Sequence, residues 1–390
     1  MTVQRRQVFY IAGFDHRGAA HYHSLYQNHA HTQAKNTAYQ ITVSDAQSVS
    51  THQMTWQIDY QDQQGTCQTD YSYLVWDDIT RAEMKPLGLD FYTSCLDAFV
   101  IYIRSGFLKN ARQHAWPFAF CMTAAYGVVL TSPWAAVAVI ALMVYGKVSW
   151  WLGLIALALL WTLVRWTNKK LNVMWLAHGF SFSARHARDE SMMSARLDEF
   201  AQTIVAAVQS KQYDEVMVIG HCYGSALLTP VMARVTTALA DQPNPTALSV
   251  ISLAQTSPLL SWLPQAKWYK QYMQQIDLSK LTWVDFSSPA DGVCFPKLDI
   301  FANAGVNQPN VLTLKSPRFF KLFDAKEYQR IIRKNKFRIH FQYLLSSKFT
   351  QEYDFFAMTA GSASLAAQLA SNSTAAKSVD HHTQVNASHV

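Results

Sequence analysis

Residues 215–225 read EVMVIGHCYGS, a short apolar run followed by Gly-His-Cys-Tyr-Gly. The apolar run predicts a buried strand, and the residues from Ser225 to about Leu239 predict an apolar helix directly after it. A glycine on each side of one central residue is typical of the sharp strand-to-helix turn that presents a nucleophile. We therefore predict that Cys222 lies at the top of a sheet, where the positive end of the helix favours its thiolate. The alternative is a buried, unreactive cysteine at the end of a core strand.

The composition favours a chain in a reducing compartment that contacts a membrane. Half of the 390 residues are hydrophobic, only 15% are charged, and the apolar residues are concentrated in a few segments. The five cysteines lack the spacing of a disulfide framework or of a zinc site. The net charge of +7 suits nucleic acid or an anionic membrane surface. The long apolar segment described below favours the membrane, so we expect no nucleic-acid partner. We also expect no metal and no cofactor.

The start of the chain predicts the first βα unit of an α/β sheet. Residues 8–12 form a compact apolar run, a glycine-bounded loop follows at 13–18, and residues 19–31 have a helical pattern. Such a loop can place a backbone N–H group beside the turn at Cys222 and help to form an oxyanion hole. Phe14 and Asp15 are the candidates to supply it, the alternative being an ordinary turn.

Residues 38–78 alternate between apolar and polar side chains, with turn residues between the runs. This pattern predicts antiparallel strands, the last of which, at 73–78, is compatible with a return to the main sheet. Asp77 and Asp78 close that run. We interpret them as a helix cap, and a metal or acid/base site is the alternative.

A helical hairpin is predicted between Trp116 and Val164, where Lys147 is the only Lys, Arg, Asp or Glu. Segments 118–145 and 148–164 are long enough, or nearly so, for a hydrocarbon core that needs about 20 apolar residues. Pro133 is expected to kink the first helix. The positive-inside rule puts both basic outer flanks in the cytoplasm: Arg104, Lys109, Arg112, Arg165, Lys169 and Lys170. The alternative is a helical pair buried in a soluble core.

The remaining chain alternates predicted helices and strands, which continues the parallel-sheet pattern. An amphipathic helix is predicted at 191–210, and from Gly361 onward the composition predicts a disordered tail. The other predicted elements are strands at 247–253 and 281–286, an aromatic-rich loop at 259–273, a basic and mostly helical segment at 316–334, and a last strand at 337–340.

The proposed nucleophile needs a base, and in chains with this type of turn the order is nucleophile, acid, histidine. After Cys222 the sequence contains His340 and three histidines in the predicted tail. Because a disordered tail cannot hold a catalytic geometry, His340 is the predicted base, at the end of the last strand. The alternative is an outward-facing histidine on a longer strand.

The acid is predicted in the loop that follows the strand at 281–286. Asp291 lies in this loop, where a carboxylate can orient the imidazole and stabilise its charged form. Asp285 and Asp299 are alternatives, and an Asp-Gly pair such as 291–292 is also a common turn signal.

The sequence Gly220-His221-Cys222-Tyr223-Gly224, with Asp291, His340 and the Gly13 loop, resembles the α/β-hydrolase superfamily. The resemblance lies in motif and order and covers roughly residues 8–30 and 175–345. Cysteine in place of the usual serine is similar to dienelactone hydrolases and polyhydroxyalkanoate synthases of that superfamily. The resemblance implies an α/β-hydrolase-like, mostly parallel sheet and acyl chemistry through a thioester. Neither group explains a membrane hairpin.

We therefore predict a membrane-anchored hydrolase of an apolar acyl ester, thioester or amide. Cys222 would attack the carbonyl, His340 would shuttle the proton and Asp291 would orient His340. The N–H groups of Tyr223 and of Phe14 or Asp15 would bind the oxyanion. The alternatives are an acyltransferase that uses the same thioester and a non-enzymatic membrane scaffold.

The predicted organisation is an α/β domain interrupted by the hairpin. Residues 1–112 are its N-terminal part with extra antiparallel strands, 113–170 the transmembrane hairpin, 171–360 its C-terminal part, and 361–390 the disordered tail. The first residues lack the pattern of a cleaved signal. We expect a multi-pass protein of a bacterial-type inner (cytoplasmic) membrane, with the catalytic domain facing the cytoplasm and the lipid bilayer as its partner.

Overall fold

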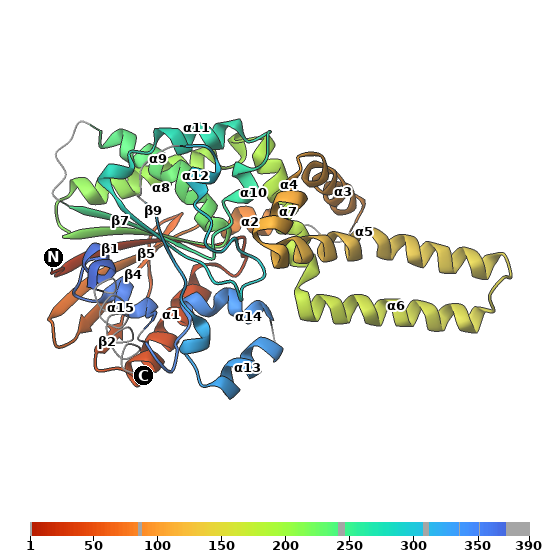
Figure 1. Ribbon diagram of the computed structural model, residues 1–390, viewed down its shortest axis with the longest axis horizontal. Coiled ribbons are helices and arrows are strands. Elements are labelled where there is room, and N and C mark those ends of the chain that lie inside the picture. Colours follow the sequence, from red (N-terminus) through yellow and green to blue (C-terminus); the bar gives the residue numbers. More distant parts are fainter. Residues whose placement is uncertain are drawn as a thin grey trace, which may run out of the picture.

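The computed structural model describes residues 2–84, 88–240, 246–306, 312–334, 336–350 and 352–371. A sheet runs through the centre of the molecule with helices on both faces, and a long helical hairpin projects from one side (Figure 1). The chain is an α/β protein, as the sequence predicts.

The sheet is mostly parallel. Its strands follow the order β2 (Gln40–Val43), β4 (Gln53–Gln61), β5 (Thr66–Leu74), β1 (Arg5–Ile11), β6 (Glu215–His221), β7 (Ala247–Leu253), β8 (Thr282–Phe286) and β9 (Leu312–Lys315), and β3 (Gln47–Ser50) pairs with β4. The strands from β5 to β9 are parallel, whereas β2, β3 and β4 form antiparallel pairs. The predicted return of the antiparallel region to the main sheet is made by β5, which pairs with β1.

Side chains that alternate along the central strands build a core on each face of the sheet. In β1, Phe9 and Ile11 belong to one core and Val8 and Tyr10 to the other. Strand β6 alternates in the same way and is buried along its whole length. Because central parallel strands are covered on both faces, they are apolar at nearly every position.

The helices divide between the two faces. One face is covered by α1 (Gly18–Ala34), α13 (Ala325–Lys334), α14 (Lys336–Phe341) and α15 (Phe355–Ala360), and the other by α7 (Val173–Arg188), α8 (Ser191–Gln209), α9 (Tyr223–Ala238) and α11 (Lys267–Gln275). The others are α2 (Asp77–Glu83), α3 (Leu89–Arg104), α4 (Phe107–His114), α5 (Trp116–Val144), α6 (Trp150–Leu171), α10 (Pro258–Ser261) and α12 (Ile300–Asn303), with 3-10 turns at Leu278–Lys280, Phe319–Lys321 and Gln342–Leu344. The predicted amphipathic helix is confirmed in α8, whose buried face includes Met193, Leu197, Phe200, Ile204 and Val208.

The predicted loop at 259–273 is wrong, because most of these residues lie in α10 and α11. Tyr269 and Met273 are four residues apart and form the buried face of α11. The Tyr269 hydroxyl donates to the Ala226 carbonyl at 2.9 Å, which ties α11 to α9. The aromatic residues at helical spacing therefore form a helix here and not a loop.

The predicted last strand at 337–340 is also wrong, because these residues belong to α14. The alternation of Phe337, Ile339, Phe341 and Tyr343 contains two pairs that are four residues apart, so it fits a helix as well as a strand. The last strand is β9, a four-residue edge strand that carries too short a pattern to be recognised.

Residues 361–371 are ordered, contrary to the predicted tail, and they include a helix at 365–371. Arg6 and Glu215 form a fully buried ion pair at 2.8 Å. Arg6 also donates to the Gly361 carbonyl at 2.7 Å, and the Leu365 N–H donates to Glu215 at 2.9 Å. Since buried charges require partners, the segment is held by the groups it supplies to this pair. The later part of the predicted tail lies outside the described residues.

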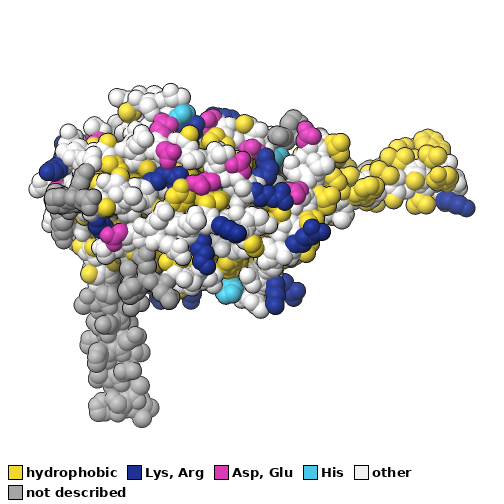
Figure 2. Space-filling view, turned by 90° about the horizontal axis from the view of Figure 1, so that it is seen from above, with side chains coloured by type: hydrophobic (Ala, Val, Ile, Leu, Met, Phe, Trp, Pro, Cys, Tyr) yellow, Lys and Arg dark blue, Asp and Glu magenta, His cyan; other side chains and the backbone are white. Residues whose placement is uncertain are grey.

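Helices α5 and α6 form the predicted hairpin. The first half of α5 packs on the body with Phe118, Met122 and Tyr126 buried, and α5 remains one helix through Pro133. Its second half and α6 project from the body as an arm covered by apolar side chains (Figure 2). Both helices are long and apolar enough to cross a membrane. The exposed side chains of the arm contradict a helical pair buried in a soluble core.

Candidate active site

Cys222 occupies the turn between β6 and α9 with φ 55° and ψ −123°. This backbone conformation is strained for a residue with a side chain and persists only where surrounding contacts enforce it. The Cys222 N–H donates to the Leu253 carbonyl at 2.9 Å. Its carbonyl accepts bonds from the Ser225 hydroxyl at 2.5 Å and the Thr256 hydroxyl at 2.9 Å. The predicted sharp turn is thus present, and Ser225 and Thr256, which the sequence did not single out, hold it.

The two glycines of the turn allow three backbone segments to meet. A Cβ atom added to Gly224 would overlap the Ile11 carbonyl oxygen and lie 2.6 Å from the Ala12 oxygen. A Cβ atom added to Gly220 would lie 2.5 Å from the Gly224 oxygen. These contacts involve backbone atoms, which cannot move aside as a flexible side chain can. The glycines are therefore required for close approach of α9 to β1.

The loop after β1 lies directly against Cys222. A Cβ atom on Gly13 would be 2.7 Å from the Cys222 Cβ and 3.3 Å from its Sγ. Among the described residues, the N–H groups of Phe14, Asp15 and Tyr223 have no backbone or side-chain acceptor. These N–H groups are the donors that the sequence predicts for an oxyanion hole. The loop that carries two of them, Phe14 and Asp15, lies against the Cys222 thiol.

The Asp15 side chain is committed elsewhere. Its carboxylate forms an ion pair with Arg17 and accepts a hydrogen bond from the Tyr22 hydroxyl at 2.8 Å. Burial tends to raise the pKa of Asp15, but the bonds and charge of Arg17 lower it overall. Only its backbone is therefore free to serve the site.

His340 and Asp291 form a buried pair, with 2.9 Å between Nδ1 and Oδ2. Burial tends to lower the pKa of His340, but the Asp291 carboxylate and the nearby Cys222 raise it above the ordinary value. Burial tends to raise the pKa of Asp291, and the charge and hydrogen bond of His340 lower it overall. With Nδ1–H donated to Asp291, Nε2 is the ring nitrogen left without a hydrogen-bond partner among the described residues.

His340 comes from α14, not from the end of a strand as predicted. His221, the residue before Cys222, contacts it: the His221 Nε2 lies 2.8 Å from the His340 carbonyl oxygen. Burial and then the charge of His340 lower the pKa of His221 to about 3, so His221 is a neutral donor at neutral pH. His221 is not among the residues predicted for the site, and its position next to Cys222 in the turn is the signal that points to it.

The alternative acids are not in contact with His340. Asp285 lies inside β8, where burial raises its pKa to about 8 against smaller opposing effects of Ser287 and Ser252. Asp299 caps α12 by accepting bonds from the Phe301 and Ala302 N–H groups, both at 3.0 Å. Asp291 is the carboxylate that the fold brings to the imidazole.

Asp77 and Asp78 have structural partners. The predicted helix cap is wrong: Trp76 occupies the N-cap position, and the two aspartates lie in the first turn of α2. Asp77 pairs with Arg81 at 2.6 Å and Asp78 with Arg196 at 2.9 Å. The structural interpretation of these two residues is supported by these ion pairs.

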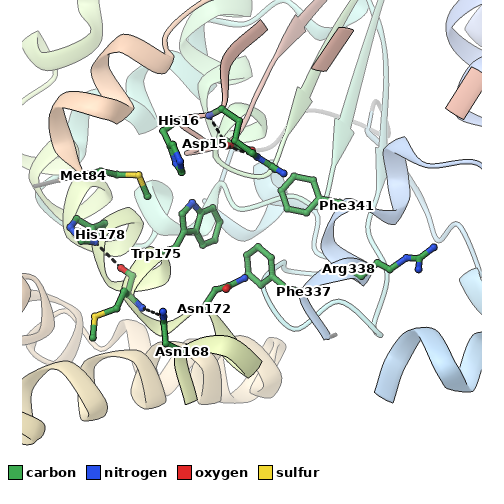
Figure 3. Close-up of a pocket in the computed structure, with 12 residues that line it drawn as sticks. Asp15, His16, Met84, Asn168, Asn172, Trp175, His178, Phe337, Arg338 and Phe341 are labelled. Atoms are coloured by element: carbon green, nitrogen blue, oxygen red, sulfur yellow. Dashed lines mark hydrogen bonds and ion pairs between the residues drawn. The ribbon is translucent and has the colours of Figure 1, made fainter. Parts of the chain in front are cut away.

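A pocket of about 520 Å³ opens beside the Asp15 loop (Figure 3). The rings of Trp175, Phe337 and Phe341 face one another across it, while Arg338 extends away. His178 and Asn172 add polar groups on the side of α7. The pocket therefore offers both aromatic and polar surface next to the candidate oxyanion loop.

Among the described residues, no group of three or more His, Cys, Asp or Glu side chains is arranged to hold a metal ion. Comparisons with protein-family models, with curated proteins and with solved structures found no match to this chain.

Replacing Asp291 by asparagine is expected to destabilise the protein in a pH-dependent way. The raised pKa of His340 means that the ionic pair contributes fully below the ordinary histidine pKa of about 6.5 and is lost as pH rises through the raised value. The lowered pKa of Asp291 keeps the carboxylate ionised at pH 6. We expect a loss of about 3 kcal/mol near pH 6 and a smaller loss at pH 9. Thermal unfolding in detergent at both pH values measures it.

The matched control is Asp299→Asn, because asparagine caps a helix about as well as aspartate. It should change the unfolding midpoint little at either pH. An equal loss for Asp291→Asn at pH 6 and pH 9 would contradict the ionic pair.

Proposed function

We propose that this chain is a membrane-anchored acyl hydrolase in which Cys222 is the nucleophile. One observation carries the proposal: Cys222 lies in a strained strand-to-helix turn, and the buried His340 is bonded through Nδ1 to Asp291 while its Nε2 has no hydrogen-bond partner among the described residues. A purely structural cysteine requires neither the strained turn nor this buried pair.

In the proposed reaction, the Cys222 thiolate attacks the carbonyl carbon of an ester, thioester or amide and forms a C–S bond. The N–H groups of Tyr223 and of Phe14 or Asp15 donate to the oxyanion. The bond to the leaving group breaks, and the leaving group takes the proton from Nε2 of His340. Water then gives a proton to Nε2 and attacks the thioester, which releases the carboxylic acid and the Cys222 thiolate. Asp291 remains ionised throughout and orients the imidazole.

The proposal includes the α/β-hydrolase fold that the turn resembles. Its support is the position of Cys222 after a central parallel strand, the Asp291 loop after β8, and the chain order Cys222, Asp291, His340. The membrane hairpin and the placement of His340 on a short helix are particular to this chain.

We also propose that the hairpin crosses a bilayer. At about 1.5 Å per residue, a hydrocarbon core of about 30 Å takes about 20 helical residues, which corresponds to α6 from Trp150 to about Lys169. Lys147 would then lie at the far surface and the basic end of α6 at the near one. Helix α3 adds an apolar face beside the base of the hairpin, because Leu89, Leu96 and Ile103 are exposed at seven-residue spacing.

A thiol-directed probe tests the proposed nucleophile. The full chain in lipid nanodiscs is treated with an alkyl chloromethyl ketone, and labelled peptides are located by mass spectrometry. We expect the label on Cys222, weaker labelling in His340→Gln, and protection by an acyl ester. Cys121, which is partly exposed and lines the apolar cavity described below, shows whether the alkyl probe reaches the protein without reacting at the turn.

Labelling of Cys121 without labelling of Cys222 in the folded protein would contradict the proposed nucleophile and favour the scaffold. If Cys222 reacts, products formed with and without an added alcohol acceptor separate hydrolysis from acyl transfer.

Cysteine labelling also tests the membrane topology. In oriented proteoliposomes, Lys147→Cys should gain labelling by a membrane-impermeant maleimide from the side opposite the body, relative to the unsubstituted chain. Gain of labelling from the body side would refute the crossing.

A further inference from the structure

A second cavity, of about 500 Å³, lies between the base of the hairpin and the loop that carries Asp291. Small-molecule pockets occupy about 300–1,000 Å³. Helix α5 contributes Trp116, Phe120 and Cys121 to its lining, and α14 contributes Phe337 and Ile339. Unlike the pocket in Figure 3, its walls are almost entirely apolar.

One wall of this cavity is the backbone that holds the candidate catalytic pair. The loop residues from Asp291 to Val293 line it, and Ile339 directly precedes His340. A Cβ atom added to Gly292 would lie 3.4 Å from the Cys121 Sγ, so the loop and α5 are in direct contact. The cavity therefore ends against the same loop that orients the imidazole.

The other end of the cavity faces the base of the hairpin. Counting about 20 residues back from Val144 places the near edge of the hydrocarbon core at about residue 125 of α5. Trp116 and Phe120 are exposed and lie about 8 to 14 Å further out, at the outer edge of the lipid headgroups and beyond it. Lys170 and Leu171 line the cavity from the corresponding end of α6. Lysine at the end of a membrane-spanning helix, as at Lys170, is typical of the membrane–water interface.

Phe337 lies between the two cavities, because it lines both. Its ring meets Trp175 edge-on, with 4.9 Å between the ring centroids. An acyl chain in the apolar cavity would therefore end close to Phe337, next to the polar pocket beside the Asp15 loop. The apolar tail of such a molecule and its polar group would then lie on opposite sides of the contact between Phe337 and Trp175.

We infer that the apolar cavity binds the unbranched acyl chain of a membrane-resident ester, with the polar leaving group in the pocket of Figure 3. The inference rests on the proposed function and names its substrate class, a single-chain amphiphile that moves from the bilayer surface to Cys222. Burial of successive methylene groups provides the selectivity for long chains, because each is favourable on its own.

Photocrosslinking tests the cavity without requiring turnover. A Cys222→Ala chain in lipid nanodiscs is irradiated with a sixteen-carbon fatty acid that carries a diazirine near mid-chain. We expect crosslinks on the loop at 289–293 and on α14, in addition to background on the projecting arm. Crosslinks confined to the arm would overturn the inference.

Cys121→Trp fills the cavity where α5 meets Gly292, and Val137→Trp is the matched control on the exposed arm. In Cys121→Trp, loop crosslinking and the ratio of kcat/KM for sixteen-carbon over four-carbon esters should each fall about tenfold or more. In Val137→Trp both should stay unchanged. Loop crosslinking that is equally strong in the two variants would refute the cavity as the site.

The two proposals fail in different ways. Loop crosslinks in a protein that turns over no ester would leave the cavity in place and contradict the proposed hydrolase. Ester turnover without loop crosslinks and without dependence on chain length would keep the hydrolase and overturn the acyl-chain cavity.

Discussion

Alanine in place of Cys222 is expected to lower kcat/KM for acyl esters by about 10⁴-fold or more, because the reaction loses the atom that forms the covalent intermediate. The fold should survive, because the substitution removes only one sulfur atom, from a residue that is 8% exposed. Hydrolysis of a chromogenic ester by purified protein in detergent measures the loss. Circular dichroism of the same sample shows whether the fold is retained.

Cys95→Ala is the matched control, because Cys95 is a buried cysteine of α3 that contacts Ser181. It should keep its activity within about threefold, the scale of a small core change away from the reaction. The double variant Cys222→Ala/His340→Ala should be no slower than Cys222→Ala by more than a small factor, since the two residues act as a unit. Activity that survives in Cys222→Ala would mean that another group is the nucleophile.

Alanine in place of Gly224 is expected to destabilise the protein by about 4 kcal/mol or more, among the largest effects of a single methyl group. The added Cβ would overlap the Ile11 carbonyl oxygen and approach that of Ala12, both of which are backbone atoms. Strand β1 cannot shift to make room, because it is paired with β5 on one side and β6 on the other. Activity should fall together with stability as the turn at Cys222 is pushed away.

Gly127→Ala is the matched control in α5, where an added Cβ meets no atom within 4 Å. Alanine there should be neutral or stabilising by up to about 1 kcal/mol, because it favours the helical backbone. The midpoints of thermal unfolding of the two variants decide the comparison. A Gly224→Ala protein as stable as the unsubstituted chain would show that the close approach of α9 to β1 is not required.

Part of the fold follows from local pattern. The apolar run before Gly220 and the 3.6-residue period of α8 each have one interpretation, so β6 and α8 were correctly predicted. The pattern of α14 has two interpretations, because apolar residues at every second position also include pairs four residues apart. In the fold, α14 is a helix that packs against α6. Strand β9 is four residues long and pairs at the edge of the sheet, so its strand character comes from β8.

Part of the candidate site also follows from the sequence, and part depends on contacts between distant segments. Chain order selected Cys222, Asp291 and His340, and the structure joins Asp291 to His340 at 2.9 Å. The supporting contacts of His221, Ser225 and Thr256 depend on residues up to 119 positions apart and have no local signal. The order of the segment after Gly361 also has no local signal. Its composition predicts disorder, but the buried Arg6–Glu215 pair supplies the hydrogen-bond partners that hold it.

The sequence by itself determined the strand, the two glycines and the cysteine at 215–225, and the apolar hairpin, because turn chemistry and hydrophobic period are local properties. Only the tertiary structure decided that the Gly13 loop lies against the Cys222 side chain and that Asp291 reaches His340. It also decided that an apolar cavity joins the hairpin to this loop. These features arise from contacts between distant segments, whose free energy is gained only when the whole sheet has formed.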